Sequence, residues 1–217
     1  MLVGNCLAFE RYAHLKPVPL PGGDVTILKP ARMALSTLWA YNLPWDDDLP
    51  PVQFLSKHEK KALESQLEGK LNTPTTSSMG RLFDAVSALL GVRQAITYEA
   101  QAAIELEALA DPDEIGYYPW QLDGNVIDLK PLLVSLLADQ NRGTEISRMA
   151  GKFHNTIAHM SLEIAQALKT TKDITKFVLS GGVWQNQLLL EKTIQLMNAH
   201  GLQPLIHRQT PPNDGCV

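Results

Sequence analysis

The sequence predicts an α/β protein in which a largely helical region precedes a C-terminal strand–helix–strand unit. Residues 176–179 (KFVL) form a short apolar run typical of a buried strand, and 180–182 (Ser-Gly-Gly) form a tight turn. An amphipathic stretch over 184–200 and a second apolar run over 202–207 follow. A strand, a Gly-Gly turn, a helix and a strand in this order favour an α/β core.

Composition limits the class of protein before any motif is considered. The chain has 217 residues, 45% of them hydrophobic, which is enough to bury a core. Its 19 basic and 23 acidic residues give a net charge of −4, so no basic face suggests a nucleic-acid partner. Cys6 and Cys216 are too few for a disulfide or CxxC scaffold, and no apolar run approaches the roughly 20 residues of a membrane span. We therefore expect a cytoplasmic protein that contacts neither nucleic acid nor membrane.

The first third of the chain predicts short elements joined by loops. Residues 1–30 are expected to be irregular or extended, and a helical pattern follows over 31–41. The acidic segment 44–51 is interpreted as a solvated turn and not a cation site, because no calcium-loop spacing follows it. Residues 55–70 suit a short surface helix.

Stronger helical periodicity follows. A helix over 79–90 is expected to end at Gly91, and the longest amphipathic stripe covers 144–168. Between them we expect a helix over 99–110, a hairpin over 117–128 and a helix capped by Asp128. The chain then divides into an N-terminal irregular or extended part (1–50), a mainly helical subdomain (51–170) and a strand–glycine loop–helix–strand core (171–217).

The Gly181–Gly182 turn is a candidate anion site. Glycines allow a ligand to approach the backbone, and the helix that follows offers free N–H groups. Asn186, one turn further on, could add an amide contact. A packing turn without a ligand explains the same residues, and by themselves the residues favour that interpretation.

Two further segments could carry chemistry. Gly80 is unusual inside a helix, where it costs about 1 kcal/mol relative to Ala, and Asp84 shares its face. The residues alone favour a helix–helix contact there, with a sugar-binding carboxylate as the alternative. Asp214, just after the last strand, is either a metal or phosphate-side carboxylate or part of an Asx turn.

The histidines and the absent motifs argue against common enzyme classes. His154 and His159 lie about 140° apart on an ideal helix, so they cannot share a metal, and each is expected to be packed or exposed. The sequence has no GxSxG, Walker, HExxH or GxGxxG motif. This argues against a conventional hydrolase, P-loop enzyme or dehydrogenase.

Seven blocks of sequence, in one order along nearly the whole chain, resemble the HypF carbamoyltransferases of nickel–iron hydrogenase maturation. The most specific is 179–190, which reads LSGGVWQNQLLL. The others are 20–24, 30–35, 77–85, 98–107, 152–155 and 207–215. The resemblance implies the C-terminal part of a TsaD-like domain, with an actin-like ATPase or RNase H-like lobe that carries a largely helical insertion.

The resemblance also implies an activity. HypF-like proteins make carbamoyl adenylate from carbamoyl phosphate and ATP, and they transfer the carbamoyl group to the C-terminal cysteine of HypE. This step belongs to the synthesis of the hydrogenase cyanide ligands. The expected ligands are therefore ATP or carbamoyl adenylate and a divalent metal (Fe, Zn or Mg), and the expected partner is HypE.

Site residues are carried over by position. Gly181 and Gly182 would line the phosphates and Asn186 would contact the nucleotide. Asp214 would bind the metal, with Asn213 as second choice. The residues that would face the ribose and base are Gly80, Asp84 and Glu105.

The chain also departs from the family. The acylphosphatase-like, zinc-finger and YrdC-like domains are not in this sequence, and the histidines that complete the metal site would precede residue 1. We therefore expect a C-terminal fragment that has little or no transferase activity alone. An apolar half-interface left open in it would favour a homodimer.

Three rival functions remain. The chain could be a non-catalytic module that binds a nucleotide or a partner, which affinity without turnover would show. It could be a TsaD-type tRNA threonylcarbamoyl transferase, against which its acidic balance argues, or a sugar or acetate kinase of the same superfamily.

Overall fold

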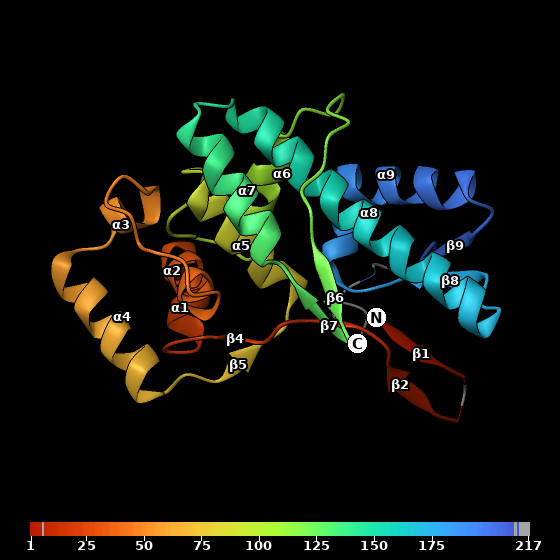
Figure 1. Ribbon diagram of the computed structural model, residues 1–217, viewed down its shortest axis with the longest axis horizontal. Coiled ribbons are helices and arrows are strands. Elements are labelled where there is room, and N and C mark those ends of the chain that lie inside the picture. The colour runs from red at the N-terminus through yellow and green to blue at the C-terminus, as the bar shows by residue number, and fades with distance from the viewer. Residues whose placement is uncertain (6, 211, 213–217) are drawn as a thin grey trace. The chain divides into compact units, whose positions relative to one another are not determined.

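The computed structural model describes residues 1–5, 7–210 and 212. The chain divides into two compact units, and Figure 1 shows their elements. Unit 1 is Met1–Ala108 with Gln121–Val134, and unit 2 is Leu109–Trp120 with Ser135–Val217. This division has other boundaries than the three parts expected from the sequence.

Two packed helices form the core of unit 1. Helix α2 (Pro30–Ala40) starts with a proline, whose fixed φ suits a first helical position, and α5 (Met79–Leu89) packs against it. Small and branched apolar residues let the two helices approach closely, and both bury most of their length. The helices expected over 31–41 and 79–90 are confirmed, and Gly91 follows α5 with a φ of +78°.

The first thirty residues are short strands and one short helix. Strands β1 (Leu2–Gly4) and β2 (Phe9–Arg11) pair antiparallel. The expectation of a wholly irregular or extended segment is wrong at α1 (Asp24–Leu28), which the positive φ of Gly22 and Gly23 leads into. The Thr26 hydroxyl donates to the Pro21 carbonyl and fixes the start of this helix.

The remaining strands of unit 1 are equally short. Strand β7 (Val126–Asp128) lies between β6 (Gln121–Asp123), to which it is antiparallel, and β3 (His14–Leu15), to which it is parallel. Strand β4 (Val18–Pro19) pairs with β5 (Thr75–Thr76). The hairpin expected over 117–128 is confirmed in its β6–β7 part, with Gly124 in the turn at φ +59°.

Three more helices surround this core or lead out of it. Helix α3 (Pro50–Phe54) precedes α4 (Lys57–Gly69), and α6 (Gln101–Leu109) follows α5. Helix α4 begins with a capping box, because the Ser56 hydroxyl accepts from the Glu59 N–H and the Glu59 carboxylate accepts from the Ser56 N–H. The surface helix expected over 55–70 and the helix expected over 99–110 are confirmed.

Two helices and a two-stranded parallel sheet make up most of unit 2. Helix α7 (Lys130–Asn141) leads into it, and α8 (Ile146–Lys172) packs against α9 (Gln187–Ala199) (Figure 1). Strands β8 (Lys176–Leu179) and β9 (Gln203–Ile206) are parallel, with Leu179 opposite Ile206. The strand–turn–helix–strand order expected from the sequence is confirmed.

The start of the last helix differs from expectation. A 3₁₀ helix, η1 (Gly182–Gln185), follows the turn, and α9 begins only at Gln187, not at residue 184. Asn186 is extended, with φ −68° and ψ 108°, and its side chain accepts from the Leu189 N–H. An N-cap residue must leave helical geometry, so Asn186 separates the two helices.

No helix among the described residues is long and apolar enough to span a bilayer.

Candidate functional site

The glycine turn presents an open stretch of backbone. Gly181 has a φ of +103° and a ψ of 157°, a conformation essentially limited to glycine. A Cβ at Gly181 would meet no atom within 4 Å, so a ligand can approach the main chain there. The Gly181 N–H donates to the Pro212 carbonyl at 2.7 Å, and Ser180 Oγ lies 3.0 Å from His207 Nε2. The turn is thus fixed from the segment that follows β9.

Asn186 faces the protein interior. Its side chain is 8% exposed, its Oδ1 accepts from the Leu189 N–H at 2.8 Å, and its Nδ2 donates to His154 Nε2 at 3.0 Å. His154 is fully buried on α8, and its Nδ1 donates to the Ala150 carbonyl at 2.7 Å. Burial, assisted by the positive charge of Lys192, lowers the pKa of His154 to about 4, against the effect of the Ala150 bond. His154 is therefore neutral and packed in the interior. Of the two environments expected from the sequence, packed or exposed, it has the first.

Gly80 and Asp84 lie on successive turns of α5. The helix begins at Met79, so Gly80 occupies its first turn and not its interior. A Cβ there would meet one atom within 4 Å, Ser78 Oγ at 3.6 Å, so the helix–helix contact inferred from the residues alone is wrong for Gly80. Asp84 is 2% exposed, and Arg81 contacts its carboxylate at 2.7 Å. Burial raises the pKa of Asp84 to about 6, although Arg81 opposes the shift.

Glu105 is held by two neighbours and remains partly exposed. Arg93 donates to both carboxylate oxygens, at 2.6 and 2.5 Å, and Gln101 Nε2 donates to Oε1 at 2.9 Å. Gln101 is itself fixed, because its Oε1 accepts from the Thr97 N–H at 2.8 Å. The bond from Arg93 lowers the pKa of Glu105, so this carboxylate is ionised at neutral pH.

The predicted site residues thus fall into two sets. Unit 1 contains Gly80, Asp84 and Glu105, whereas unit 2 contains Gly181, Gly182 and Asn186. Asp214 and Asn213, the expected metal ligands, lie outside the described residues. Within residues 1–5, 7–210 and 212, no group of three or more His, Cys, Asp or Glu side chains could hold a metal ion. The described residues therefore do not by themselves form a metal centre.

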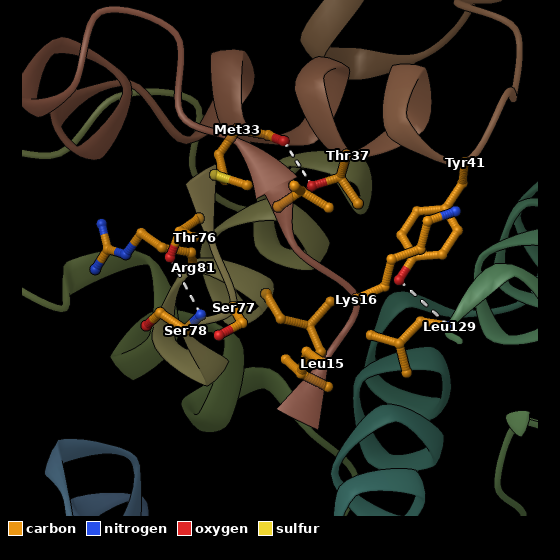
Figure 2. A pocket seen from close by; sticks show the side chains of 12 residues that line it. Leu15, Lys16, Met33, Thr37, Tyr41, Thr76, Ser77, Ser78, Arg81 and Leu129 are labelled. Carbon is orange, nitrogen blue, oxygen red and sulfur yellow. Dashed lines mark hydrogen bonds between the residues drawn. The ribbon is translucent and has the colours of Figure 1, made fainter. Parts of the chain in front are cut away.

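A small pocket in unit 1 lies beside the start of α5 (Figure 2). Lys16, Tyr41, Ser78 and Arg81 are among its lining residues, and the Tyr41 hydroxyl accepts from the Leu129 N–H. Its volume is about 20 Å³, which is room for about one water. This pocket is therefore too small to hold a nucleotide.

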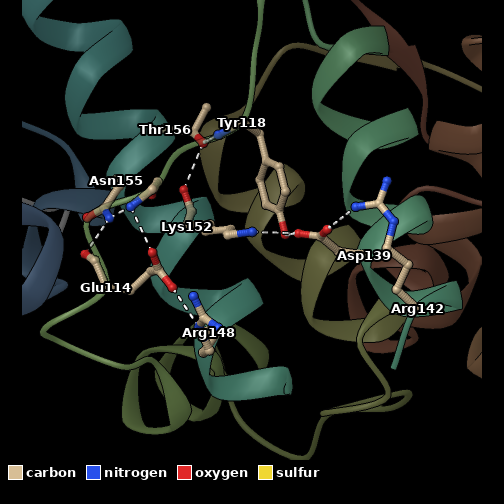
Figure 3. A network of polar contacts seen from close by, with 9 residues as sticks. Glu114, Tyr118, Asp139, Arg142, Arg148, Lys152, Asn155 and Thr156 are labelled. Carbon is tan, nitrogen blue, oxygen red and sulfur yellow. Dashed lines mark hydrogen bonds and ion pairs between the residues drawn. The ribbon is translucent and has the colours of Figure 1, made fainter. Parts of the chain in front are cut away.

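Sequence reasoning missed a network of polar contacts in unit 2 (Figure 3). Asp139 accepts from Lys152 at 2.8 Å and from the Tyr118 hydroxyl at 3.1 Å, and it also pairs with Arg142. Asn155 donates to the carbonyls of Glu114 and Gly116, at 2.6 and 2.8 Å. These bonds fasten the segment 111–120 to α8.

The sequence carried little signal for this network. His154, Asn155 and Thr156 lie between Phe153 and Ile157 of the apolar stripe, so on a helix they face away from it, where polar residues are ordinary. Only the structure shows that all three are buried, and buried polar groups need partners. The identity of the partners depends on the tertiary structure, and the sequence could not supply it.

Comparisons with known proteins show which family this chain resembles. The family model "Carbamoyltransferase, Kae1-like Domain, second subdomain" matches residues 1–217. The chain is 34% identical to Carbamoyltransferase HypF of Synechocystis sp., over 96% of this chain and 29% of that protein. It is 36% identical to Carbamoyltransferase HypF of Rhodobacter capsulatus, over 99% of this chain and 28% of that protein.

Solved structures show the same relationship. A full-length HypF in its phosphate- and nucleotide-bound form matches with a TM-score of 0.89 and 37% identity, over 99% of this chain and 34% of that one. HypF of T. kodakarensis matches with a TM-score of 0.75 and 27% identity, over 95% of this chain and 28% of that one. The predicted α/β fold of the actin-like ATPase class is confirmed. The chain spans about a third or less of these relatives' length, and it belongs to the HypF carbamoyltransferase family as the second subdomain of a Kae1-like domain.

Proposed function

We propose that this chain supplies nucleotide-binding residues to a HypF-type carbamoyltransferase. The observation that carries the proposal is the open glycine turn after β8, where a phosphate could approach the main chain at Gly181. The Gly181 N–H is engaged with the Pro212 carbonyl, so the donors to the phosphate would be backbone N–H groups at the start of η1, from Gly182 on, which suit phosphate oxygens. The relative whose solved structure contains phosphate and nucleotide matches this chain over 99% of its length, which supports the same ligand class here.

The acids of unit 1 have unequal access to a ribose. The Glu105 carboxylate is partly exposed and ionised, and it retains lone pairs for a hydroxyl donor beside its bonds to Arg93 and Gln101. Asp84 is buried beneath its pair with Arg81, so it acts on a ligand only through that arginine. Among the acids we therefore assign the ribose contact to Glu105.

The proposed reaction is carbamoyl transfer within the longer protein. The thiolate of the HypE C-terminal cysteine attacks the carbamoyl carbon of carbamoyl adenylate. A sulfur–carbon bond forms, the bond from that carbon to the phosphate oxygen breaks, and AMP leaves with the electron pair. Backbone donors at the glycine turn would stabilise the charge that develops on the phosphate. The nucleophile belongs to the partner, so the chain requires no nucleophilic residue of its own.

The nucleotide proposal is tested by titrating AMP and ATP into the chain in a calorimeter. We expect binding to weaken about tenfold or more in Gly181→Ala, because the methyl group occupies the open face and the φ of +103° disfavours a side chain. Gly143→Ala is the matched control: Gly143 also has a positive φ (+75°) and an open Cβ position, but it lies between α7 and α8. Undiminished affinity in Gly181→Ala, or no affinity in the unaltered chain, would contradict the proposal.

The transfer step needs a separate test. We expect no carbamoylated HypE when this chain alone is mixed with HypE, carbamoyl phosphate and ATP, since it spans only about a third of the length of these relatives. Mass spectrometry of the HypE C-terminal peptide measures the product. A carbamoyl adduct formed by this chain alone would show that the remaining domains are not required.

A further inference from the structure

A buried series of hydrogen bonds links helix α8 to Asn186, the residue between η1 and α9. It runs from the Ala150 carbonyl to His154 Nδ1 at 2.7 Å, and from His154 Nε2 to Asn186 Nδ2 at 3.0 Å. It continues from Asn186 Oδ1 to the Leu189 N–H at 2.8 Å. His154 and Asn186 are 0% and 8% exposed, so these bonds form out of contact with bulk water.

The neighbours determine the orientation of each group in this chain of bonds. A backbone N–H can only donate, so the atom of Asn186 that faces Leu189 must be the oxygen. The amide nitrogen therefore faces His154, and Nε2 must be the acceptor. The Ala150 carbonyl can only accept, so Nδ1 carries the proton. The geometry requires the neutral, Nδ1-protonated tautomer of His154.

Asn186 is the residue on which the turn and the helix both depend. Its N–H donates to the Val183 carbonyl at 3.2 Å and ends η1, while its carbonyl accepts from the Leu190 N–H at 3.0 Å and starts α9. A rotation of the side-chain amide would release the Leu189 N–H from its cap. The bond that the Asn186 amide donates to His154 therefore supports η1 and, through it, the glycine turn, which is also held by the contacts of Gly181 and Ser180 with the segment after β9.

Helix α8 provides a fixed support for this bond. The two residues that follow His154 in the sequence are tied to the 111–120 segment, since Asn155 donates to the Glu114 and Gly116 carbonyls and Thr156 Oγ1 accepts from the Tyr118 N–H at 2.8 Å. His154 consequently presents its acceptor from a rigid part of unit 2.

We infer that His154 is a positioning residue, which fixes the Asn186 amide and through it the geometry of the glycine turn. Asn186 then supports the turn through the amide N–H that it donates to His154, whereas the family resemblance implies a role in contacting the nucleotide. Only the effect on nucleotide affinity rests on the proposed function. The tautomer and the amide orientation can be measured whether or not the chain binds a nucleotide.

The first measurement is the nitrogen NMR spectrum of the chain labelled at histidine. We expect His154 to show a protonated Nδ1 and an unprotonated Nε2 at neutral pH. Asn186→Asp keeps an N-cap acceptor for Leu189 but places a carboxylate against Nε2. We expect His154 to take up a second proton in this variant, with Lys192 as the nearby charge that opposes it. A protonated Nε2 in the unaltered chain, or no change in Asn186→Asp, would overturn the inference.

The second measurement compares nucleotide affinity in three variants. His154→Phe keeps a ring but leaves the buried Asn186 amide without its acceptor, and we expect AMP binding to weaken about tenfold. His154→Gln restores an acceptor oxygen and is expected to restore most of the affinity. Thr193→Val removes a buried hydroxyl from α9 that bonds within the helix to Leu189, and it should leave affinity unchanged.

The results separate the two proposals. If the unaltered chain shows the expected tautomer but binds no nucleotide, the proposed function fails and the positioning role of His154 stands. If His154→Gln binds as poorly as His154→Phe while both remain folded, or if His154→Phe binds as well as the unaltered chain, the positioning role fails. Should His154→Phe not fold, the Asn186→Asp spectrum decides.

Discussion

The two units hold their predicted nucleotide residues in different ways. In unit 1 the partners are close in sequence: Arg81 pairs with Asp84 three positions away, and Arg93 with Glu105 twelve positions away. In unit 2 the partner of Asn186 is His154, 32 positions away on another helix. Around these residues unit 1 thus relies on local ion pairs, whereas unit 2 relies on neutral hydrogen bonds that exist only when α8 and α9 are packed. The two sets should respond differently to mutation, pH and salt.

The largest expected effect concerns the support of α8 in unit 2. Asp139, 10% exposed at its side chain, accepts from Lys152, Tyr118 and Arg142. Asp139→Ala leaves a mostly buried ammonium and a buried hydroxyl without their acceptor, and it should lower the free energy of unfolding by about 3 to 4 kcal/mol. Urea unfolding followed by circular dichroism measures this.

The matched control is Asp113→Ala, which removes an exposed aspartate in the 111–120 segment of unit 2 and should cost about 0.5 kcal/mol or less. A loss below about 1 kcal/mol in Asp139→Ala would mean that apolar packing, and not the polar network, holds α8 in place.

The next effect is the acid sensitivity that His154 gives unit 2. Unfolded, its imidazole takes a proton near pH 6.5, whereas in the folded chain the pKa is about 4. Between these values the unfolded state binds more protons, so the stability due to neutral His154 is complete above pH 6.5 and declines as the pH falls toward 4. The expected decline is about 3 kcal/mol.

Unfolding of the unaltered chain and of His154→Gln across this pH range isolates the contribution, because other acid-sensitive groups are common to both. Parallel stability curves for the two proteins would show that His154 titrates normally and is not held neutral.

Asp84 should give unit 1 a dependence of the opposite sign. Burial raises its folded pKa to about 6 from the ordinary 3.8, so the folded state binds the proton first. Its contribution to stability therefore grows as the pH falls from 6 toward 3.8 and is lost as the pH rises through 6. The expected size is about 2 to 3 kcal/mol, slightly less than for His154 because the shift is smaller.

Asp84→Asn should remove this dependence, and the difference from the unaltered chain, measured by urea unfolding at pH 4 and pH 7, reports it. If the difference has the same sign as that of His154, the Arg81 pair dominates over burial and Asp84 stays ionised.

The same contrast separates the elements that could be predicted from the sequence from those that could not. Helices α5 and α8 were predictable because their apolar residues recur with helical spacing, and the strand–turn–helix order around Gly181 was predictable from composition. Helix α1 was missed because the proline and glycine residues before it mark a loop, and a five-residue helix leaves almost no periodicity.

The site was predictable only in part. Glu105 came only from a block of family resemblance, whereas the turn at Gly181 was already a candidate anion site from its residues, and the local spacing of Arg81 and Asp84 is visible in the sequence. The His154–Asn186 bond was not, because two polar residues 32 positions apart meet only through the packing of α8 on α9. Helix α9 starts late because the Asn186 side chain caps it through a local hydrogen bond. The sequence analysis placed the helix start at residue 184, because Trp184 and Asn186 are both compatible with a helical pattern.

The smallest effect on stability should come from the Arg93–Glu105 pair. Both side chains are partly exposed, so water and salt screen their attraction, and exposed pairs contribute little to folding. Glu105→Gln should therefore change the melting temperature only slightly at low salt, and the difference should vanish at high salt. The same substitution should weaken AMP binding about tenfold, because it replaces a charged acceptor of the ribose by a neutral one.

Lys29→Ala, which breaks a comparably exposed pair with Glu59, provides the control for melting and should leave AMP binding unchanged. A stability loss in Glu105→Gln that persists at high salt would show that unit 1, like unit 2, depends on its polar contacts to fold. Local ion pairs would then no longer distinguish the two units.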